Sequence, residues 1–301
     1  MDLIDAVAER VVVLDGGLAS ELERRGHDLS SELWSARLLR DDPAAIVDVH
    51  RAFADAGAEV VTSASYQASF EKLGDDAGPL LRRSVALARE AGTPWVAASV
   101  GPYGAMLADG SEYRGDYGLT VAQLRQWHRR RLAALDDADP DVLAVETIPC
   151  LAEVEALCAE LTALATPAWL SITCDGTETR AGEPASEAFA MARDCDAIVA
   201  VGVNCTAPDD VAELVREAAN ASDKPVVVYP NSGEAWNPER RRWVGEPAFN
   251  AEAVTVWTDN GARLVGGCCR VRPEDVADIR AVVDARTGTP ASNGSRRRSA
   301  S

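Results

Sequence analysis

A short apolar run, a polar loop and a segment with helical periodicity recur in that order along the chain, and this repeat constrains the fold more than any other feature. Eight such runs are present, each nearly continuous in apolar residues, as expected of buried strands. They cover residues 11–17, 59–65, 95–101, 142–148, 168–174, 197–204, 225–231 and 262–267. Eight strands that alternate with helices through right-handed crossovers are all parallel, and eight is the number that a closed (β/α)₈ barrel requires.

One domain accounts for the 301 residues better than two, because a single barrel of this type needs about 250. The competing architecture is an open doubly wound sheet. However, the Asp15-Gly16-Gly17 turn after the first strand lacks the G-x-G-x-x-G spacing of a dinucleotide-binding turn. We therefore predict an α/β protein with one (β/α)₈ TIM-barrel domain over residues 1–286. Residues 287–301, rich in Gly, Ser and Arg, are expected to form a disordered C-terminal tail.

The composition argues against several classes of partner. The 48 acidic and 30 basic residues give a net charge of −18, which repels phosphate backbones, so no nucleic-acid partner is expected. No apolar run approaches the roughly 20 residues of a membrane span, and no basic region precedes the first apolar residues. We therefore expect a cytoplasmic protein without a membrane partner. Seven cysteines, an odd number, indicate reduced thiols rather than a disulfide framework.

Three of the cysteines fall where a barrel builds its active site. The carboxyl ends of barrel strands share one face, and functional groups come from the loops there. Cys205 follows the sixth predicted strand, whereas Cys268 and Cys269 follow the eighth, directly after Gly266-Gly267. Only one strand lies between these two, so the three thiols can meet. The remaining cysteines are expected to be core residues: Cys150, Cys158, Cys174 and Cys195.

Three thiolates at one point favour Zn²⁺ as a cofactor. Soft sulfur ligands disfavour magnesium and calcium, and three protein ligands leave one of the four positions of zinc open, as in catalytic sites. No histidine is expected at a strand exit. Adjacent residues of a regular strand point to opposite faces, so Cys268 and Cys269 can bind one ion only if the backbone leaves strand geometry there. The two preceding glycines make such a departure easy.

An open zinc site of this kind favours alkylation of a thiol. A thiol bound as the fourth ligand loses its proton and becomes a nucleophile at neutral pH. Asp15 and Glu146, at the ends of the first and fourth strands, can hold the ammonium group of an amino-acid substrate. The N–H groups of Gly16 and Gly17 can meet its carboxylate. The alternative is a non-catalytic protein that stores zinc or senses oxidants through its thiols.

The segments that carry these residues resemble the homocysteine S-methyltransferase family, from Leu14 to about Val283. The strongest matches are Gly-Val-Asn-Cys, which ends at Cys205, and Gly-Gly-Cys-Cys-Arg, which contains Cys268 and Cys269. By this resemblance the three cysteines bind zinc and act in catalysis through it. The sulfur of L-homocysteine then completes the site.

Further segments extend the resemblance to the substrate. Asp-Gly-Gly from Asp15 and Glu-Thr-Ile-Pro from Glu146 resemble the homocysteine-binding segments of the family, and Ser-Tyr-Gln-Ala-Ser and Tyr-Pro-Asn-Ser-Gly-Glu also match. The substrate-binding residues implied are Asp15, Gly16, Gly17, Tyr66, Gln67, Glu146 and Asn231.

The loop 101–117 indicates the methyl donor. It looks like the loop of enzymes that use S-methylmethionine or S-adenosylmethionine, rather than betaine or a methylfolate. The sulfonium cation of such a donor can rest against an aromatic face, for which Tyr103, Tyr113 and Trp236 are candidates. We therefore expect zinc-dependent transfer of a methyl group from a sulfonium donor to L-homocysteine, giving methionine. Selenohomocysteine or another thiol is an alternative acceptor.

Overall fold

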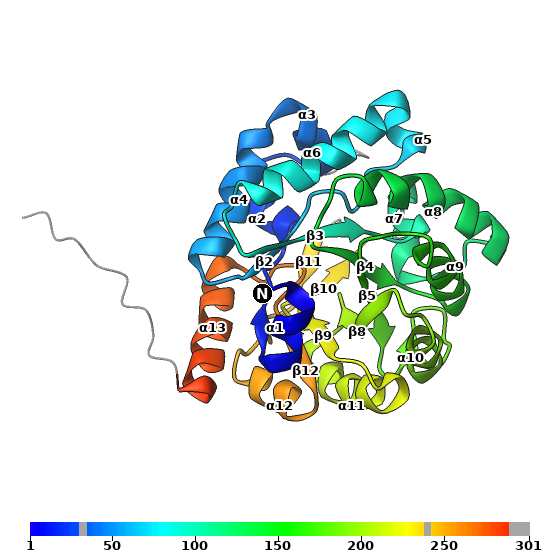
Figure 1. Cartoon of the computed structure of the whole chain (residues 1–301). Helices are drawn as coiled ribbons and strands as arrows, with labels where there is room; N and C mark the ends of the chain where they lie inside the picture. The colour runs from blue at the N-terminus through cyan, green and yellow to red at the C-terminus, as the bar shows by residue number, and fades with distance from the viewer. Residues whose placement is uncertain (30–34, 238–241, 289–301) are drawn as a thin grey trace, which may run out of the picture.

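Eight parallel strands form one barrel in the computed structural model (Figure 1). The order in the sheet is β1-β12-β9-β8-β5-β4-β3-β2. A bridge between Leu14 and Val60 and a hydrogen bond from the Glu59 N–H to the Val13 carbonyl join the first strand to the last. The structure describes residues 1–29, 35–237 and 242–288. The barrel strands are β1 (Val12–Val13), β2 (Val60–Thr62), β3 (Trp95–Val100), β4 (Val142–Ile148), β5 (Ala168–Ile172), β8 (Ile198–Asn204), β9 (Val226–Tyr229) and β12 (Ala262–Val265). The predicted (β/α)₈ fold is confirmed.

One main helix follows each barrel strand, as the repeat predicts. In chain order these helices are α4 (Pro43–Asp55), α6 (Ala77–Arg89), α8 (Val121–Asp136), α9 (Leu151–Leu161), α10 (Ala185–Arg193), α11 (Val211–Ser222), α12 (Ala253–Asp259) and α13 (Pro273–Thr287). Local capping sets where they begin. The Asp42 carboxylate accepts the Ala45 N–H at the start of α4, and Thr120 and Gln123 form a capping box at the start of α8.

The last helix fixes the C-terminal end of the described fold. α13 runs to Thr287 and is capped by Gly288, so the predicted domain boundary at residue 286 falls inside its final turn. Most of the predicted tail, residues 289–301, lies outside the described residues.

The loops contain additional short helices, 3₁₀ turns and hairpins. Apart from α1, they all follow the carboxyl end of a strand and surround one mouth of the barrel. They are α1 (Leu3–Glu9), α2 (Leu18–Arg24), α3 (Ser35–Asp41), α5 (Phe70–Leu73), α7 (Tyr103–Leu107), the 3₁₀ turns η1 (Gly74–Asp76), η2 (Ser111–Tyr113) and η3 (Pro208–Asp210), and the hairpins β6 (Cys174–Asp175) with β7 (Glu178–Thr179) and β10 (Ala235–Asn237) with β11 (Arg242–Val244).

The opposite end of the barrel is filled with apolar side chains. Helix α1 lies across that opening in Figure 1, and its buried residues Leu3 and Val7 belong to the same apolar cluster as Trp95 and Trp169 of the barrel interior. A second and larger core lies between the strands and the outer helices. Because the amino-terminal end is packed in this way, the polar strand ends are gathered at the carboxyl-terminal mouth.

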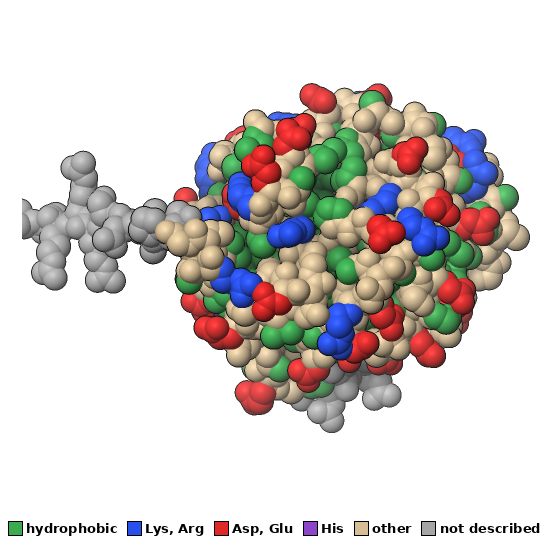
Figure 2. Space-filling model, turned by 60° about the horizontal axis from the view of Figure 1, so that its bottom comes forward, with side chains coloured by type: hydrophobic (Ala, Val, Ile, Leu, Met, Phe, Trp, Pro, Cys, Tyr) green, Lys and Arg blue, Asp and Glu red, His purple; other side chains and the backbone are tan. Residues whose placement is uncertain are grey.

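The surface carries the acidic excess without concentrating it. Acidic and basic side chains are interspersed over the face shown in Figure 2, with hydrophobic side chains between them. Among the described residues, no helix combines the length and the apolarity that crossing a bilayer requires.

Candidate active site

The three thiols singled out in the sequence meet at the barrel mouth. Cys205 comes directly after β8, and Cys268 and Cys269 follow β12. The Sγ atom of Cys205 lies 2.6 Å from that of Cys268 and 3.8 Å from that of Cys269. All three Sγ atoms lie within 4.8 Å of one another, the spacing of a group able to hold one metal ion.

The backbone leaves strand geometry before the cysteine pair, which was the condition for such a cluster. Strand β12 ends ahead of the two glycines, and the Val271 N–H donates to the Cys268 carbonyl across a tight turn (3.1 Å). A Cβ atom on Gly267 would lie 2.1 Å from a methyl carbon of Val271, so only glycine fits there. This turn lets Cys268 and Cys269 both face Cys205.

The backbone is also unusual at the ends of β4 and β8. Thr147 and Cys205 have φ angles of 60° and 49°, in the left-handed region that residues other than glycine rarely adopt. Asn204 connects these two positions. Its Oδ1 accepts the Thr147 N–H (2.7 Å) and its Nδ2 donates to Thr147 Oγ1 (2.8 Å) and toward Cys268 Sγ (3.9 Å). Thus one amide holds both strained strand ends and reaches the thiol cluster.

The thiols differ in acidity because they share protons. Hydrogen bonds from Cys268 and then Cys269 hold the pKa of Cys205 well below the usual thiol range. The pKa values of Cys268 and Cys269 are raised, chiefly by their interaction with Cys205. The cluster therefore favours one soft anion supported by two thiols, which is the kind of centre that attracts a thiophilic metal cation.

Asp15 is buried at the end of β1 without a cationic partner among the described residues. Its exposed fraction is 4%, and its carboxylate accepts the Thr62 N–H (2.7 Å) and the Thr62 hydroxyl (3.0 Å). Burial raises its pKa to about 7, more than the bonds from Thr62 lower it. Such a carboxylate is ready to receive a positive charge from a ligand.

Glu146 makes a second acceptor for a cation at the same mouth. It is 8% exposed, accepts the Ser99 hydroxyl and lies beside the Tyr229 hydroxyl. Burial raises its pKa to about 8, and the negative charges of Cys205 and Asp15 add to this effect. No lysine or arginine pairs with either carboxylate within the described part of the chain. An ammonium group between them would supply the missing positive charge.

The two glycines after Asp15 are fixed by packing, which takes up the N–H of Gly17, while the predicted role of the Gly16 N–H stays a prediction. The Gly17 N–H already donates to the Val271 carbonyl (3.0 Å), so our expectation that it meets a substrate carboxylate is wrong in this structure. A Cβ on Gly16 would lie 2.5 Å from the Val271 carbonyl oxygen, and one on Gly17 would lie 2.6 Å from that of Cys268. Glycine is needed because this loop packs directly on the turn that carries the cysteines.

The remaining predicted substrate residues divide into two groups. The ring of Tyr66 packs over Gly101 and its hydroxyl lies near Thr147 and Cys205, so Tyr66 belongs to the site. The buried Oδ1 of Asn231 has no hydrogen-bond partner, as expected of an atom that contacts a ligand. Gln67 joins its loop to α7 by donating to the Ala105 carbonyl (3.1 Å), but its buried Oε1 also has no partner, so its predicted contact with substrate stays a prediction.

Arg131 of α8 is a buried positioning group that sequence reasoning missed. Its exposed fraction is 2%, and its guanidinium donates to the carbonyl oxygens of Gly101 (2.7 Å), Ser65 (2.9 Å) and Tyr66 (2.6 Å). It thereby holds the loops after β2 and β3 together beneath Tyr66. Because an arginine on a predicted outer helix reads as a surface residue, the sequence offered no signal for this role.

The three candidate aromatic residues have different positions. The ring of Tyr103 packs edge-on against Tyr117 and Trp127, with centroid separations of 5.3 and 5.2 Å. The hydroxyl of Tyr113 lies beside the thiols of Cys205 and Cys269. The side chain of Trp236 lies outside the described part of the structure. Of the two whose side chains are described, Tyr113 is the one that the structure brings to the cluster.

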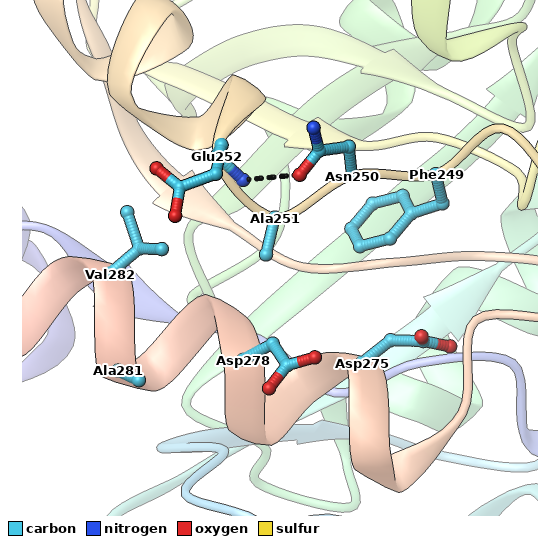
Figure 3. Close-up of a pocket in the computed structure, with 8 residues that line it drawn as sticks. All are labelled: Phe249, Asn250, Ala251, Glu252, Asp275, Asp278, Ala281 and Val282. Atoms are coloured by element: carbon cyan, nitrogen blue, oxygen red, sulfur yellow. Dashed lines mark hydrogen bonds between the residues drawn. The ribbon is translucent and has the colours of Figure 1, made fainter.

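A surface pocket of about 290 Å³ lies away from this site, between the loop before α12 and helix α13 (Figure 3). The Glu252 N–H donates to Asn250 Oδ1 (3.0 Å) on one side of it, and Asp275 and Asp278 line the other. None of the three clustered thiols lines it. The convergence of chemically reactive groups, and not pocket size, identifies the barrel mouth as the candidate site.

Comparison with known proteins agrees with this geometry. The model of the homocysteine S-methyltransferase family matches residues 12–283. A homocysteine S-methyltransferase of Bacillus subtilis (strain 168), YbgG, is 41% identical over 296 residues, which cover 90% of this chain and 94% of that protein. A selenocysteine Se-methyltransferase of Brassica oleracea var. italica is 42% identical over 302 residues, covering 89% and 87%.

A solved structure is similar over nearly the whole fold. The metallated form of the homocysteine methyltransferase MmuM from Escherichia coli has a TM-score of 0.81 and 39% identity, and the alignment covers 91% of this chain and 96% of that one. A family model that spans the barrel, close relatives over most of both lengths, and the same fold lead to one conclusion. This chain belongs to the homocysteine S-methyltransferase family.

Proposed function

We propose that the protein uses zinc, bound by Cys205, Cys268 and Cys269, to transfer a methyl group from S-methylmethionine or S-adenosylmethionine to L-homocysteine. The observation that supports this most directly is the position of three clustered thiols beside two buried carboxylates that lack a cationic partner. Homocysteine carries a thiol and an ammonium group. Its thiol can therefore join the cysteine cluster while its ammonium group pairs with the two carboxylates.

The donor set fits zinc. Three sulfur atoms without a carboxylate or imidazole among them favour a thiophilic ion over magnesium or calcium. Two thiolates about 2.3 Å from a tetrahedral zinc ion lie about 3.8 Å apart. Cys205 and Cys269 have this separation, whereas Cys205 and Cys268 are closer and must move apart when an ion binds. The MmuM structure named above is described as metallated, which agrees with a metal at this position.

The bound metal supplies a Lewis acid that keeps the homocysteine thiol deprotonated near neutral pH. The residues of the chain provide orientation. Asp15 and Glu146 hold the ammonium group from two sides, which fixes where the substrate sulfur lies relative to the cluster. Tyr66 and Tyr113 cover the thiols and limit the access of water. Orientation of this kind accounts for a large share of the rate enhancement in a bimolecular transfer.

The transfer balances without a general acid. The homocysteine thiolate forms a new S–C bond to the methyl carbon, while the S–C bond of the sulfonium breaks and its electron pair stays on the departing sulfur. An anion and a cation thus become two neutral thioethers. The only proton to leave is that of the homocysteine thiol, before transfer. Accordingly, no residue of the site needs to protonate a leaving group.

The alternative of a non-catalytic zinc-storing or redox-sensing barrel does not explain Asp15 and Glu146. A storage site needs no buried carboxylates beside the thiols, and burying them is unfavourable without a ligand. Membership of a methyltransferase family also argues against this alternative. Selenohomocysteine or another thiol is an alternative acceptor, and the similarity to a selenocysteine Se-methyltransferase supports the use of a selenol.

The direct test is to incubate zinc-loaded protein with homocysteine and each sulfonium donor in turn and to measure methionine. We expect methionine from at least one donor, none from betaine or a methylfolate, and a loss of zinc and activity in Cys268→Ala. Cys158→Ala, outside the cluster, is the matched control and should keep both. Absence of product with both sulfonium donors would refute the donor assignment. Full activity of Cys268→Ala would refute the role of the cluster. Competition between homocysteine and selenohomocysteine then ranks the acceptors.

A further inference from the structure

The donor needs its own binding groups, because the homocysteine ammonium already accounts for Asp15 and Glu146. Both proposed donors share a sulfonium cation and an amino-acid end that carries an α-carboxylate. A complementary pocket must therefore present an anion and a cation of its own close to the thiol cluster. Two charged side chains at the barrel mouth have no opposite charge bound to them within the described structure.

The first is Glu112, in the η2 turn of the loop after β3. Its exposed fraction is 6%, and its buried Oε2 has no hydrogen-bond partner. No described lysine or arginine forms an ion pair with it, since the nearby Arg114 pairs with Asp109 and Asp116. The charge of Glu112 acts on Cys205 and on the Tyr66 hydroxyl, so the carboxylate lies near the cluster. Burial raises its pKa to about 7, and the positive charge of Arg114, which forms no ion pair with Glu112, offsets only part of this rise.

The second is Arg180, in the loop that follows the β6–β7 hairpin. Its guanidinium carbon lies 5.7 Å from the centre of the Tyr113 ring. Its Nε is 3.5 Å from Thr173 Oγ1, which in turn donates to the Cys205 carbonyl (3.1 Å). No carboxylate of the described chain pairs with it. An arginine in this setting has most of its donors available for a ligand, and a carboxylate is the group that its planar fork binds best.

We propose that Glu112, Tyr113 and Arg180 form the subsite for the methyl donor. Arg180 binds the α-carboxylate of the sulfonium amino acid, and Glu112 faces the sulfonium cation. The Tyr113 ring faces the Arg180 guanidinium and its hydroxyl lies beside the thiols, so it lines the path of the methyl group. This inference rests on the proposed function, because it takes the donor to be a sulfonium amino acid.

The subsite also explains how product leaves. Transfer converts the sulfonium into a neutral thioether, and Glu112 then loses the cation that it faced. The attraction between Glu112 and the donor is therefore absent from the product complex. A carboxylate at this position favours binding of the charged donor over retention of the neutral product.

Binding can be measured without turnover, because no transfer occurs when homocysteine is absent. Calorimetric titration of zinc-loaded protein with S-methylmethionine gives the donor affinity directly. Two analogues separate the contributions: (3-aminopropyl)dimethylsulfonium lacks the carboxylate, and methionine lacks the sulfonium charge. The variants are Glu112→Gln and Arg180→Gln. Glu213→Gln and Arg216→Gln are matched controls, since these two residues form an exposed ion pair on α11.

We expect the wild-type protein to bind S-methylmethionine about tenfold or more tightly than either analogue. Arg180→Gln should lose the preference over the analogue without a carboxylate but keep the preference over methionine. Glu112→Gln should lose the preference over methionine but keep the preference over the analogue without a carboxylate. In turnover, both variants should raise the KM for the donor about tenfold and leave the KM for homocysteine nearly unchanged. The α11 controls should match the wild type in every measurement.

Other results would overturn the assignment. A rise in the homocysteine KM of Arg180→Gln, with unchanged donor binding, would assign Arg180 to the acceptor carboxylate instead. Unchanged donor binding in both variants would remove the subsite altogether, while wild-type transfer from the sulfonium would still uphold the proposed function. Arg180→Lys covers the case in which Arg180→Gln unfolds. It keeps the charge without the fork, and should retain an intermediate donor affinity.

Discussion

The indole N–H of Trp169 donates a hydrogen bond to the hydroxyl of Tyr229 over 3.0 Å, inside the barrel. The Tyr229 hydroxyl lies beside Glu146 in turn. A line of polar contacts thus runs from the apolar interior up to the carboxylate that we propose holds the substrate ammonium. Trp169 fixes the hydroxyl, and the hydroxyl orients the carboxylate.

This relationship predicts the effect of Tyr229→Phe. Removing the hydroxyl leaves the Trp169 N–H unpaired and takes one neighbour from Glu146, so the carboxylate is held less firmly. We expect the KM for homocysteine to rise several-fold, and stability to fall by about 1 to 2 kcal/mol. Steady-state kinetics and denaturant unfolding measure the two effects. Tyr103→Phe, in the aromatic cluster beside α8, is the control. An equal rise of the homocysteine KM in Tyr229→Phe and Tyr103→Phe would contradict the proposal that the Tyr229 hydroxyl orients Glu146.

Asp15→Asn tests recognition of the ammonium group. The amide keeps the shape of the side chain but removes the negative charge. We expect the KM for homocysteine to rise about tenfold or more, by loss of a charge-assisted hydrogen bond. With 4-mercaptobutanoic acid, an acceptor that lacks the amino group, wild type and variant should have similar kcat/KM. A loss of the same size with both acceptors would indicate a structural role for Asp15.

Asn204→Ala tests support of the thiol cluster. The amide bonds Thr147 twice and reaches Cys268, so its loss frees two strained strand ends next to the proposed ligands. We expect zinc affinity, measured by competition with a chelator, to fall about 10- to 100-fold. Asn220→Ala, an exposed change on α11, should leave zinc affinity as it is. Retention of wild-type affinity in Asn204→Ala would show that the cysteines alone define the site.

Gly267→Ala tests the turn that presents the cysteine pair. The added methyl group would overlap Val271, with only 2.1 Å between the carbon atoms. We expect a loss of about 1 to 3 kcal/mol in unfolding free energy together with weaker zinc binding. In Gly78→Ala, on α6, the new methyl group meets only the end of Arg82 at 3.6 Å, and helix propensity should make that variant as stable as the wild type or more so. Unimpaired zinc binding in Gly267→Ala would show that the turn can change shape without moving the cysteine pair, which would contradict the need for glycine at this position.

His50 predicts a loss of stability in acid. It is fully buried on α4, and burial lowers its pKa from 6.5 to about 4. The folded protein therefore keeps this ring neutral while the unfolded chain takes up a proton below pH 6.5. Stability must fall as the pH drops from 6.5 through 4, by about 2 to 3 kcal/mol from this group. Urea unfolding at pH 7 and 4.5 should show that His50→Leu loses less over this interval. If the wild type and His50→Leu lost the same unfolding free energy between the two pH values, His50 would be excluded as the cause.

The sequence by itself determined the barrel and the identity of the thiols. Eight apolar runs separated by helical segments leave few alternatives, because each run must be buried and each crossover is right-handed. Cysteines directly after the sixth and eighth runs had to lie at the carboxyl mouth. Asp15 and Glu146 followed from the same rule. These inferences needed only the order of elements along the chain, and the structure agrees with the positions that they imply.

Only the tertiary structure decided what surrounds those residues. These surroundings depend on contacts between loops far apart in the sequence. They include the bonds of Asn204 to Thr147, the bonds of Arg131 to two loops, and the absence of an ion-pair partner for Glu112 and Arg180 among the described residues. No periodicity encodes such contacts, because side-chain direction and hydrogen bonding are settled when the chain packs. The same reason explains the correction at Gly17, whose N–H is taken by Val271 from the other end of the chain. Strand order brings ligands to a common mouth, whereas packing determines which of their atoms remain available.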